Sequence, residues 1–350
     1  MIEKLLKNLI KISSISGQEK EIARFVFNYF KSKGLKPKLL LGNNVYCEIG
    51  KGKKTLLLNS HLDTVPPSSS WTIKPFKAKM LNGKIYGLGA CDTKGNLATM
   101  MEAMIDLNKS KTELKGRVIF LATDNEENRK PSGLEILIKK INCDAIVIGE
   151  PTDLNICISE KGFAKLKIIS KGRAAHAAFG KKDFNAVYKA AKDIEALNKL
   201  EFKKKHKFLG LPSIQVTMIN GGIVSNMIPD SCEFILDIRS SPIYPNDYLI
   251  NLIKKKVSSE VEVVSNRIFP KETNVKEKIV QAAKKSAPKS KIAGFLAVSD
   301  FAFVDKPGII LGAGSLKQAH SPNEFVKISQ LKEVKEIYKK TIQKYFQNEN

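Results

Sequence analysis

Short hydrophobic runs alternate with amphipathic stretches along the first half of the chain. Runs rich in Val, Ile and Leu are typical of strands buried inside a sheet, and four are predicted: Val45–Gly50, Thr55–Ser60, Arg117–Thr123 and Ala145–Glu150. Apolar residues at helical spacing predict helices over Met1–Ile12, Gln18–Lys33, Asn96–Asn108 and Gly133–Lys140. This order predicts an α/β domain with helices on both faces of a sheet, and functional groups at the carboxyl ends of its strands.

The pattern changes after Gly162. Strands are predicted over Phe163–Ser170, Ser213–Ile219 and Cys232–Ser240, and long helices over Asp183–Leu200 and Asp247–Ser259. After Pro270 the first pattern resumes, with a helix over Val275–Ser286, a strand over Gly308–Leu311 and a helix over Ser329–Phe346. We therefore expect residues 1–162 and 271–350 to form one discontinuous domain, into which residues 163–270 insert as an α+β unit.

The positive charge of the chain comes almost entirely from lysine. It has 59 basic and 35 acidic residues, a formal net charge of +24, and only six of the basic residues are arginines. Proteins that read nucleic acids rely on arginine, whose planar guanidinium forms bidentate hydrogen bonds, whereas these lysines are scattered over every segment. We therefore expect no nucleic-acid partner, although a specific anionic partner remains open.

Hydrophobicity and cysteine spacing indicate where the protein works. No apolar run approaches the roughly 18 residues that span a bilayer, and Met1–Ile12 carries lysines among its apolar residues, unlike a signal peptide. The five cysteines form no Cys-x-x-Cys pair, which disfavours a disulfide framework and a structural zinc knuckle. We expect a cytoplasmic protein with no membrane partner.

Acidic and imidazole side chains follow several predicted strands and one glycine-rich turn. Because the carboxyl ends of neighbouring parallel strands meet at one edge of a sheet, we expect these side chains to lie close together. They are His61 and Asp63 after Thr55–Ser60, Asp92 after Gly87-Leu-Gly-Ala-Cys91, Glu126 and Glu127 after Arg117–Thr123, Glu150 at the end of Ala145–Glu150, and His320 after Gly312-Ala-Gly314.

Each of these residues alone would be an ordinary loop charge or a satisfied polar residue. Several carboxylates on one sheet edge would repel each other strongly unless cations neutralised them. Two histidines and several carboxylates are the ligand types of a two-zinc hydrolytic site. The pattern therefore favours a metal site over a solvated sheet edge.

Five motifs follow one another in order along nearly the whole chain. They are His61-Leu-Asp-Thr-Val-Pro66, Tyr86-Gly-Leu-Gly-Ala-Cys-Asp-Thr-Lys-Gly95, Glu126-Glu127, Gly149-Glu-Pro-Thr152 and Ala319-His-Ser-Pro-Asn-Glu324. Together they resemble the family of two-zinc hydrolases that includes acetylornithine deacetylase, succinyl-diaminopimelate desuccinylase, aminoacylase-1 and glutamate carboxypeptidase. The resemblance implies a hydrolase domain with helices on both faces of a mixed sheet and an inserted α+β lid and dimerisation domain.

The resemblance implies a role for each residue of the predicted site. Asp92 would bridge two Zn²⁺ ions per subunit, with Co²⁺ as a substitute. His61 and Glu150 would complete the ligands of one ion, and Glu127 and His320 those of the other. Asp63 would hold His61 from behind, and Glu126 would be the general base and then the general acid.

The inserted unit matches the family at two further places. Gly172-Arg-Ala-Ala-His176 resembles the motif whose histidine enters the partner subunit's site in family homodimers and stabilises the oxyanion. Asn226 and Arg239 match residues that hold the substrate carboxylate, and Gly312 belongs to a glycine loop that binds substrate. By contrast, we expect His206, within a run of lysines, to be a solvated loop residue.

The motifs resemble acetylornithine deacetylase most, through Trp71-Thr72 and Gly314-Ser-Leu-Lys-Gln-Ala-His320. The expected reaction is cleavage of N-acetylornithine, a small N-acyl amino acid, to ornithine and acetate. Desuccinylation of succinyl-diaminopimelate and release of lysine or ornithine from a carrier protein remain alternatives. A catalytically silent binding protein on the same fold is the non-enzyme alternative, which the presence of all five expected ligands and Glu126 disfavours. One departure from the family is Asn125, where the acidic motif usually begins with Asp.

Overall fold

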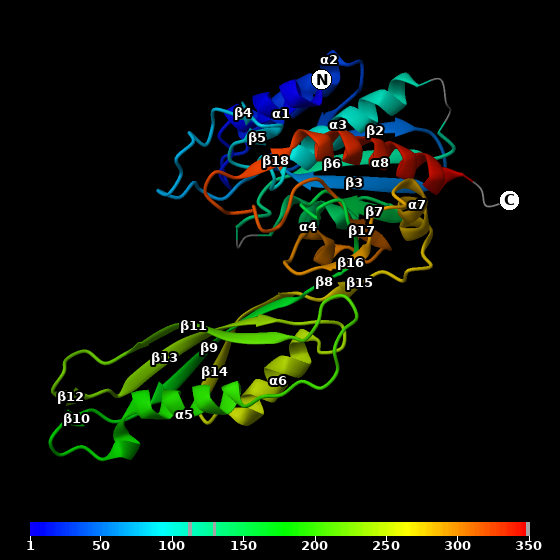
Figure 1. Ribbon diagram of the computed structural model, residues 1–350. Helices are drawn as coiled ribbons and strands as arrows, with labels where there is room; N and C mark the ends of the chain where they lie inside the picture. Colours follow the sequence, from blue (N-terminus) through cyan, green and yellow to red (C-terminus); the bar gives the residue numbers. More distant parts are fainter. Residues whose placement is uncertain (111–113, 129–130, 348–350) are drawn as a thin grey trace. The chain divides into compact units, whose positions relative to one another are not determined.

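A computed structural model describes residues 1–110, 114–128 and 131–347. The chain divides into two compact units, Met1–Ile158 with Thr273–Asn350 (unit 1) and Ser159–Glu272 (unit 2). Figure 1 shows both units with their helices and strands. Within the described ranges, no helix is both long enough and apolar enough to span a membrane. The five cysteines all lie in these ranges, are buried, and are joined by no disulfide.

Unit 1 is built on a mixed sheet with the order β1-β2-β6-β3-β7-β17-β8. Its four central strands, β6, β3, β7 and β17, run parallel, whereas β2 and β8 pair antiparallel with their neighbours. The strands are β1 (Lys38–Leu39), β2 (Val45–Gly50), β3 (Thr55–His61), β6 (Arg117–Thr123), β7 (Ala145–Ile148), β8 (Ile156–Glu160), β16 (Ile292–Phe295), which pairs with β8, and β17 (Gly308–Ile310).

Helices cover both faces of this sheet, as the sequence predicted. All residues of β3 are buried, which is why its sequence reads as one continuous apolar run and does not alternate. On one face, Leu57 and Ile119 pack with Leu134 of α4 (Gly133–Leu137). On the other, Phe120 meets Phe30 of α2 (Lys20–Ser32) edge to face, and α3 (Lys94–Lys109) lies against β2, β3 and β6.

Three further helices and a small sheet complete unit 1. Helix α3 is buried along most of its length because α1 and α8 pack against it, and α7 packs against α8. These elements are α1 (Ile2–Lys11), α7 (Lys278–Ser286), α8 (Ile328–Phe346) and the antiparallel strands β4 (Lys79–Leu81), β5 (Lys84–Tyr86) and β18 (Phe325–Lys327). The sheet β18-β5-β4 matters for the site because β5 leads into the turn before Asp92, and β18 follows the segment that carries His320.

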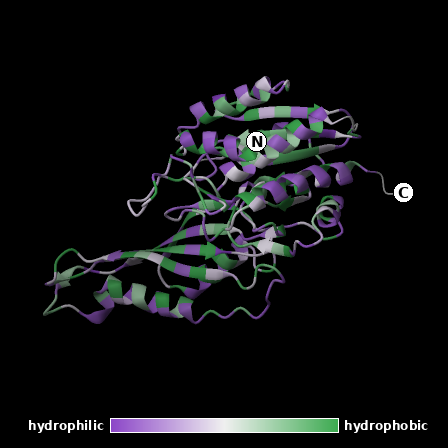
Figure 2. Cartoon of the chain, turned by 45° about the horizontal axis from the view of Figure 1, so that its top comes forward, coloured by the Kyte–Doolittle hydropathy of each residue, from purple (hydrophilic) through white to green (hydrophobic). Residues whose placement is uncertain are grey.

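Unit 2 is a four-stranded antiparallel sheet with the order β11-β13-β9-β14, and two helices pack on it. Side chains along β9 and β13 alternate between buried and half-buried, the pattern of a sheet with one covered face. Figure 2 shows hydrophobic residues in green and hydrophilic residues in purple along the strands of this sheet. The elements are β9 (Phe163–Lys171), β11 (Ser213–Gly221), β13 (Ser231–Arg239), β14 (Glu260–Ile268), α5 (Ala186–Asn198), α6 (Asn246–Lys256), the pair β10 (Ala175–His176) and β12 (Met227–Ile228), and β15 (Lys271–Glu272).

One predicted helix boundary was wrong, and one strand was missed, each for a local reason. The helix predicted from Asp183 begins at Ala186, because the side chain of Asn185 accepts the backbone N–H groups of Val187 and Tyr188 and caps the helix there. Strand β14 was not predicted. It lies at the edge of its sheet and its register shifts twice, so its apolar residues do not alternate regularly.

The prediction for His206 was also wrong. The histidine is buried, with 5% of its surface exposed, while the lysines beside it are exposed. Its Nδ1 accepts the backbone N–H groups of Phe208 and Leu209, both at 3.2 Å, and its Nε2 lies 3.4 Å from a carboxylate oxygen of Glu272. The imidazole therefore stabilises a tight turn and is buried there, which the lysines around it in the sequence did not indicate.

Candidate dinuclear metal site

His61 is the last residue of β3, and its imidazole is buried. Its Nδ1 lies 2.9 Å from the backbone carbonyl oxygen of Asp63 and 3.5 Å from the Asp63 carboxylate. Its Nε2 lies 3.2 Å from Oδ1 of Asp92 and 3.7 Å from Oε1 of Glu150. Since Nδ1 is hydrogen-bonded to the backbone oxygen of Asp63, Nε2 is the nitrogen available to a metal ion beside the two carboxylates.

Asp92 lies between two histidines. Its Oδ1 faces Nε2 of His61, and its Oδ2 lies 3.4 Å from Nε2 of His320. The residue ends the turn before α3, and the peptide bond between Asp92 and Thr93 is cis. The hydroxyl of Thr93 donates to the backbone oxygen of Gly149, next to Glu150. A carboxylate with one oxygen toward each histidine has the placement of a bridging ligand.

Glu126 and Glu127 follow β6, and Asp63 fixes the backbone of both. The Asp63 carboxylate accepts the N–H of Glu126 at 3.1 Å and that of Glu127 at 2.9 Å. It also accepts the hydroxyl of Ser16 at 2.6 Å. Asp63 was predicted to hold His61, and its carboxylate lies closer still to these three donors than to the imidazole. It therefore positions the acidic pair as well.

The other expected ligands come from Glu150, which follows β7, and from His320, which follows β17. Nε2 of His320 lies 2.9 Å from Oε1 of Glu127. His320 adopts a left-handed backbone conformation with φ of 55°, and about half of its side chain is exposed at 52%, whereas Glu150 is buried. The five expected ligands thus converge from five separate segments of unit 1.

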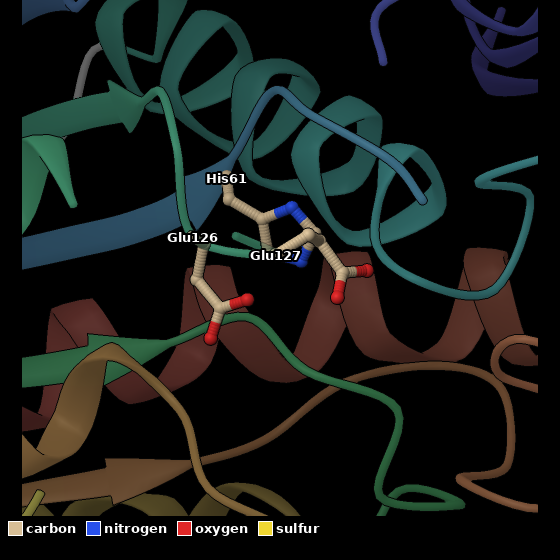
Figure 3. A group of neighbouring side chains, drawn as sticks. All are labelled: His61, Glu126 and Glu127. Carbon is tan, nitrogen blue, oxygen red and sulfur yellow. The ribbon is translucent and has the colours of Figure 1, made fainter. Parts of the chain in front are cut away.

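Among the described residues, three sets of side chains each bring three possible ligand atoms within 4.8 Å of one another. The sets are His61 with Glu126 and Glu127, His61 with Asp92 and Glu150, and Asp92 with Glu127 and His320. Figure 3 shows the first set, in which the side chains of His61, Glu126 and Glu127 lie beside one another. The second and third sets share Asp92, and together they contain every residue predicted as a ligand. Glu126 belongs only to the first set, which lacks Asp92.

The electrostatics of these groups fit a site that binds cations. Burial raises the pKa of Glu126 and of Glu150 well above the usual range, and neighbouring carboxylates raise both further. Burial and then the charge of Asp92 raise the pKa of Glu127. Burial would lower the pKa of His61, but hydrogen bonds to Asp63 and Asp92 and the charges of Glu150 and Glu126 raise it well above its usual value. Crowded carboxylates of this kind are stabilised by divalent ions, and imidazole with carboxylate donors suits transition metals.

The remaining predicted residues have their own surroundings. His176 and Asn226 lie side by side in unit 2, because β10 pairs with β12 and the N–H of Ala177 donates to the backbone oxygen of Asn226. Both are exposed. Arg239 donates from Nε and Nη2 to the two carboxylate oxygens of Asp237, at 2.7 and 3.1 Å.

Gly312 was predicted to bind substrate. Its N–H donates to the hydroxyl of Thr152, and its carbonyl oxygen accepts the N–H of Leu154. A Cβ at this position would lie 2.4 Å from both Oδ1 of Asn96 and the backbone oxygen of Glu150. The glycine is thus required for the close packing of the backbone that carries Glu150.

Two buried carboxylates near the site were given no role from the sequence. Asp300 accepts the hydroxyls of Ser132 and Thr123, and burial raises its pKa to about 6. Glu324 accepts three backbone N–H groups from the turn that ends at Asp92. Glu324 lies inside one of the recognised motifs, so a signal was present, whereas nothing in the spacing of Asp300 indicated burial.

The sequence and fold are similar to those of several known proteins. A model of peptidase family M20/M25/M40 matches residues 57–344. An acetylornithine deacetylase of Buchnera aphidicola is 30% identical, covering 98% of this chain and 97% of that protein. A succinyl-diaminopimelate desuccinylase of Rickettsia canadensis is 29% identical, over 95% of this chain and 96% of that protein. The fold is similar to the solved structure of the YxeP protein of Bacillus subtilis, which is described as a dinuclear metal-binding M20 peptidase. The match covers 97% of this chain and 96% of the YxeP chain, with a TM-score of 0.74 at 15% sequence identity.

These matches confirm the predicted family, the α/β fold and the class of reaction. The family model extends from within β3, four residues before His61, to within α8, so it includes all five expected ligands. The chain therefore belongs to peptidase family M20/M25/M40, a family of metal-dependent hydrolases that cleave amide bonds.

Proposed function

We propose that this protein is a two-zinc amidohydrolase that removes the acetyl group of N-acetylornithine, giving ornithine and acetate. The observation that carries the proposal is the arrangement around Asp92, whose two oxygens face His61 on one side and His320 on the other. The acetylornithine deacetylase relative, aligned over nearly the full length of both chains, supports the choice of acyl group and amine.

The two donor sets that share Asp92 are the proposed ligands. His61, Asp92 and Glu150 would hold one ion, and Asp92, Glu127 and His320 the other. Zinc is the proposed metal because imidazole nitrogens and carboxylate oxygens are its usual ligands in catalytic sites, and Co²⁺ is the expected substitute. When bound, two such ions supply Lewis-acid polarisation of a carbonyl and lower the pKa of a water molecule.

Glu126 is the proposed general base. It follows directly after β6, beside Glu127, and the backbone hydrogen bond to Asp63 fixes its position. Because it is not part of either set that contains Asp92, its carboxylate is free to accept a proton from the attacking water and donate it to the departing amine nitrogen. Asp63 would act through its neighbours, by orienting the imidazole of His61 and the backbone of the acidic pair.

We propose that unit 1 is the catalytic domain and that unit 2 is a lid through which the protein forms homodimers. Strand β11 is an edge strand, and it and the loop after it expose four large apolar side chains: Met218, Ile219, Ile223 and Val224. Exposed edge strands with apolar residues are ready to pair with another chain. The partner subunit's His176 would then stabilise the oxyanion, and Asn226 and the guanidinium donors of Arg239 that Asp237 leaves free would bind the substrate carboxylate.

Succinyl-diaminopimelate desuccinylase activity is the second candidate, since a desuccinylase is related to this chain at nearly the same identity. The deciding experiment measures kcat/KM of the zinc-loaded protein on N-acetylornithine and on N-succinyl-diaminopimelate, with the Glu126→Gln variant as a control for contaminating hydrolases. We expect faster turnover of N-acetylornithine. Faster turnover of the succinyl substrate would replace the proposed substrate and leave the proposed site in place. No turnover of either would favour a carrier-linked substrate or a binding protein.

A further inference from the structure

Glu324 is a buried carboxylate, 1% exposed, and it accepts hydrogen bonds from one turn. Its Oε2 accepts the N–H of Gly89 at 2.8 Å, and its Oε1 accepts those of Cys91 at 2.6 Å and Asp92 at 2.9 Å. Its backbone oxygen accepts a fourth N–H, that of Gly87, at 3.0 Å. One residue therefore holds four N–H groups within six consecutive positions.

This turn determines where the Asp92 carboxylate lies. The turn connects β5 to α3 and ends at Asp92, two residues before the helix begins. The N–H of Asp92 itself is one of the four groups bound, so its backbone cannot rotate without breaking a hydrogen bond to a buried carboxylate. Hydrogen bonds to ionised groups are stronger than neutral ones, and an unsatisfied buried N–H is costly.

Glu324 also lies four residues after His320, at the end of the same segment. The segment is fixed there, because Asn323 accepts the N–H groups of Thr72 and Ile73 through its side chain and β18 begins at Phe325. The carboxylate of Glu324 thus links the segment that carries His320 to the turn that carries Asp92. Those two residues approach each other at 3.4 Å in the site.

We propose that Glu324 is a positioning residue of the metal site, which fixes Asp92 between the two histidines and holds the His320 segment against it. It touches no substrate and is not a ligand; it acts through the backbone of Asp92. Outer hydrogen-bond partners of metal ligands contribute about 10-fold to 100-fold to metal affinity. The inference rests on the proposed ligand roles of Asp92 and His320.

The test is a titration of the metal-free protein with Co²⁺, followed by visible absorbance and by calorimetry, with no substrate present. The Glu324→Gln variant keeps the size of the side chain but replaces one acceptor oxygen by a donor group that faces the same N–H groups. We expect it to bind the Co²⁺ ions about 10-fold to 100-fold more weakly than the wild type. Its turnover should return toward the wild-type kcat when Co²⁺ is raised in the same proportion.

A matched control separates this role from general stability. Asp193 in unit 2 is also buried and also accepts backbone N–H groups, those of Ser258 and Ser259 at 2.8 and 3.1 Å. Asp193→Asn should lower the melting temperature of the metal-free protein and leave the Co²⁺ titration unchanged. If Glu324→Gln does not fold, Glu324→Asp, which keeps the charge but is one methylene too short to reach all three N–H groups, replaces it.

The outcomes are distinct. If Glu324→Gln lowers the melting temperature but binds Co²⁺ like the wild type, Glu324 is only structural and the inference is wrong. If the wild type itself fails to bind two Co²⁺ ions, the proposed dinuclear site fails instead.

Discussion

Glu126→Gln is the substitution that best separates proton transfer from metal binding. The structure keeps the backbone of Glu126 in place through its N–H bond to Asp63, and glutamine has nearly the same shape, so the site should retain its geometry. Glutamine cannot accept the proton of the attacking water. General acid–base catalysis contributes about 10²-fold to 10⁴-fold, so kcat should fall by that factor, which is about 3 to 5 kcal/mol in activation free energy.

The assay compares kcat on N-acetylornithine with metal content in Glu126→Gln and in its neighbour Glu127→Gln. We expect Glu126→Gln to keep two metal ions and Glu127→Gln to bind one of them more weakly, because only Glu127 belongs to a set with Asp92. A base must be deprotonated to act, so wild-type kcat/KM should rise with pH through the pKa of Glu126, and this acid limb should vanish in Glu126→Gln. Metal loss from Glu126→Gln with metal retention in Glu127→Gln would mean that Glu126 is the ligand and Glu127 the general base.

Three further predictions concern the rest of the molecule. His176→Ala should lower kcat by about 10²-fold to 10³-fold with metal binding intact. Mixing this variant with Glu126→Gln should restore about a quarter of wild-type activity, because half of the dimers would be mixed and one of the two sites in each mixed dimer would be intact. If the subunits demonstrably exchange and the mixture stays inactive, His176 does not act in the partner's site. Met218→Glu, on the exposed edge strand β11, should convert dimers to monomers in sedimentation analysis, and an unchanged dimer would exclude this edge as the interface. A hydrogen bond to Glu127 raises the pKa of His320 to about 9, so His320 binds its proton more tightly in the folded chain than in the unfolded chain. Urea unfolding of the metal-free protein should therefore show stability falling from pH 6.5 toward 9, and stability rising over this range would contradict this protonation state.

The central strands and the metal ligands could be predicted from the sequence because burial and chemistry leave local signals there. Thr55–His61 reads as a strand because nearly every side chain is apolar, and it is buried on both faces. The carboxyl ends of parallel strands meet at one edge, so His61, Glu127 and Glu150 could be placed near one another before any coordinates were known.

Other features depend on contacts that the pattern of hydrophobic and charged residues does not show. His206 is buried by its own turn, although four lysines surround it in the sequence. The hydrogen bond from the N–H of Glu126 to Asp63 joins residues 63 positions apart, and that from the N–H of Asp92 to Glu324 joins residues 232 positions apart. Such bonds follow from how the segments fold together, and neither spacing nor composition indicates them.

Metal analysis of the purified wild type and of Asp92→Ala, after reconstitution with Zn²⁺ and removal of loosely bound ions, tests the central claim most directly. Two donor sets share Asp92, so one carboxylate would serve both ions. We expect two zinc ions per wild-type chain and the loss of both from a folded Asp92→Ala variant. Retention of two tightly bound ions by Asp92→Ala would contradict a shared ligand.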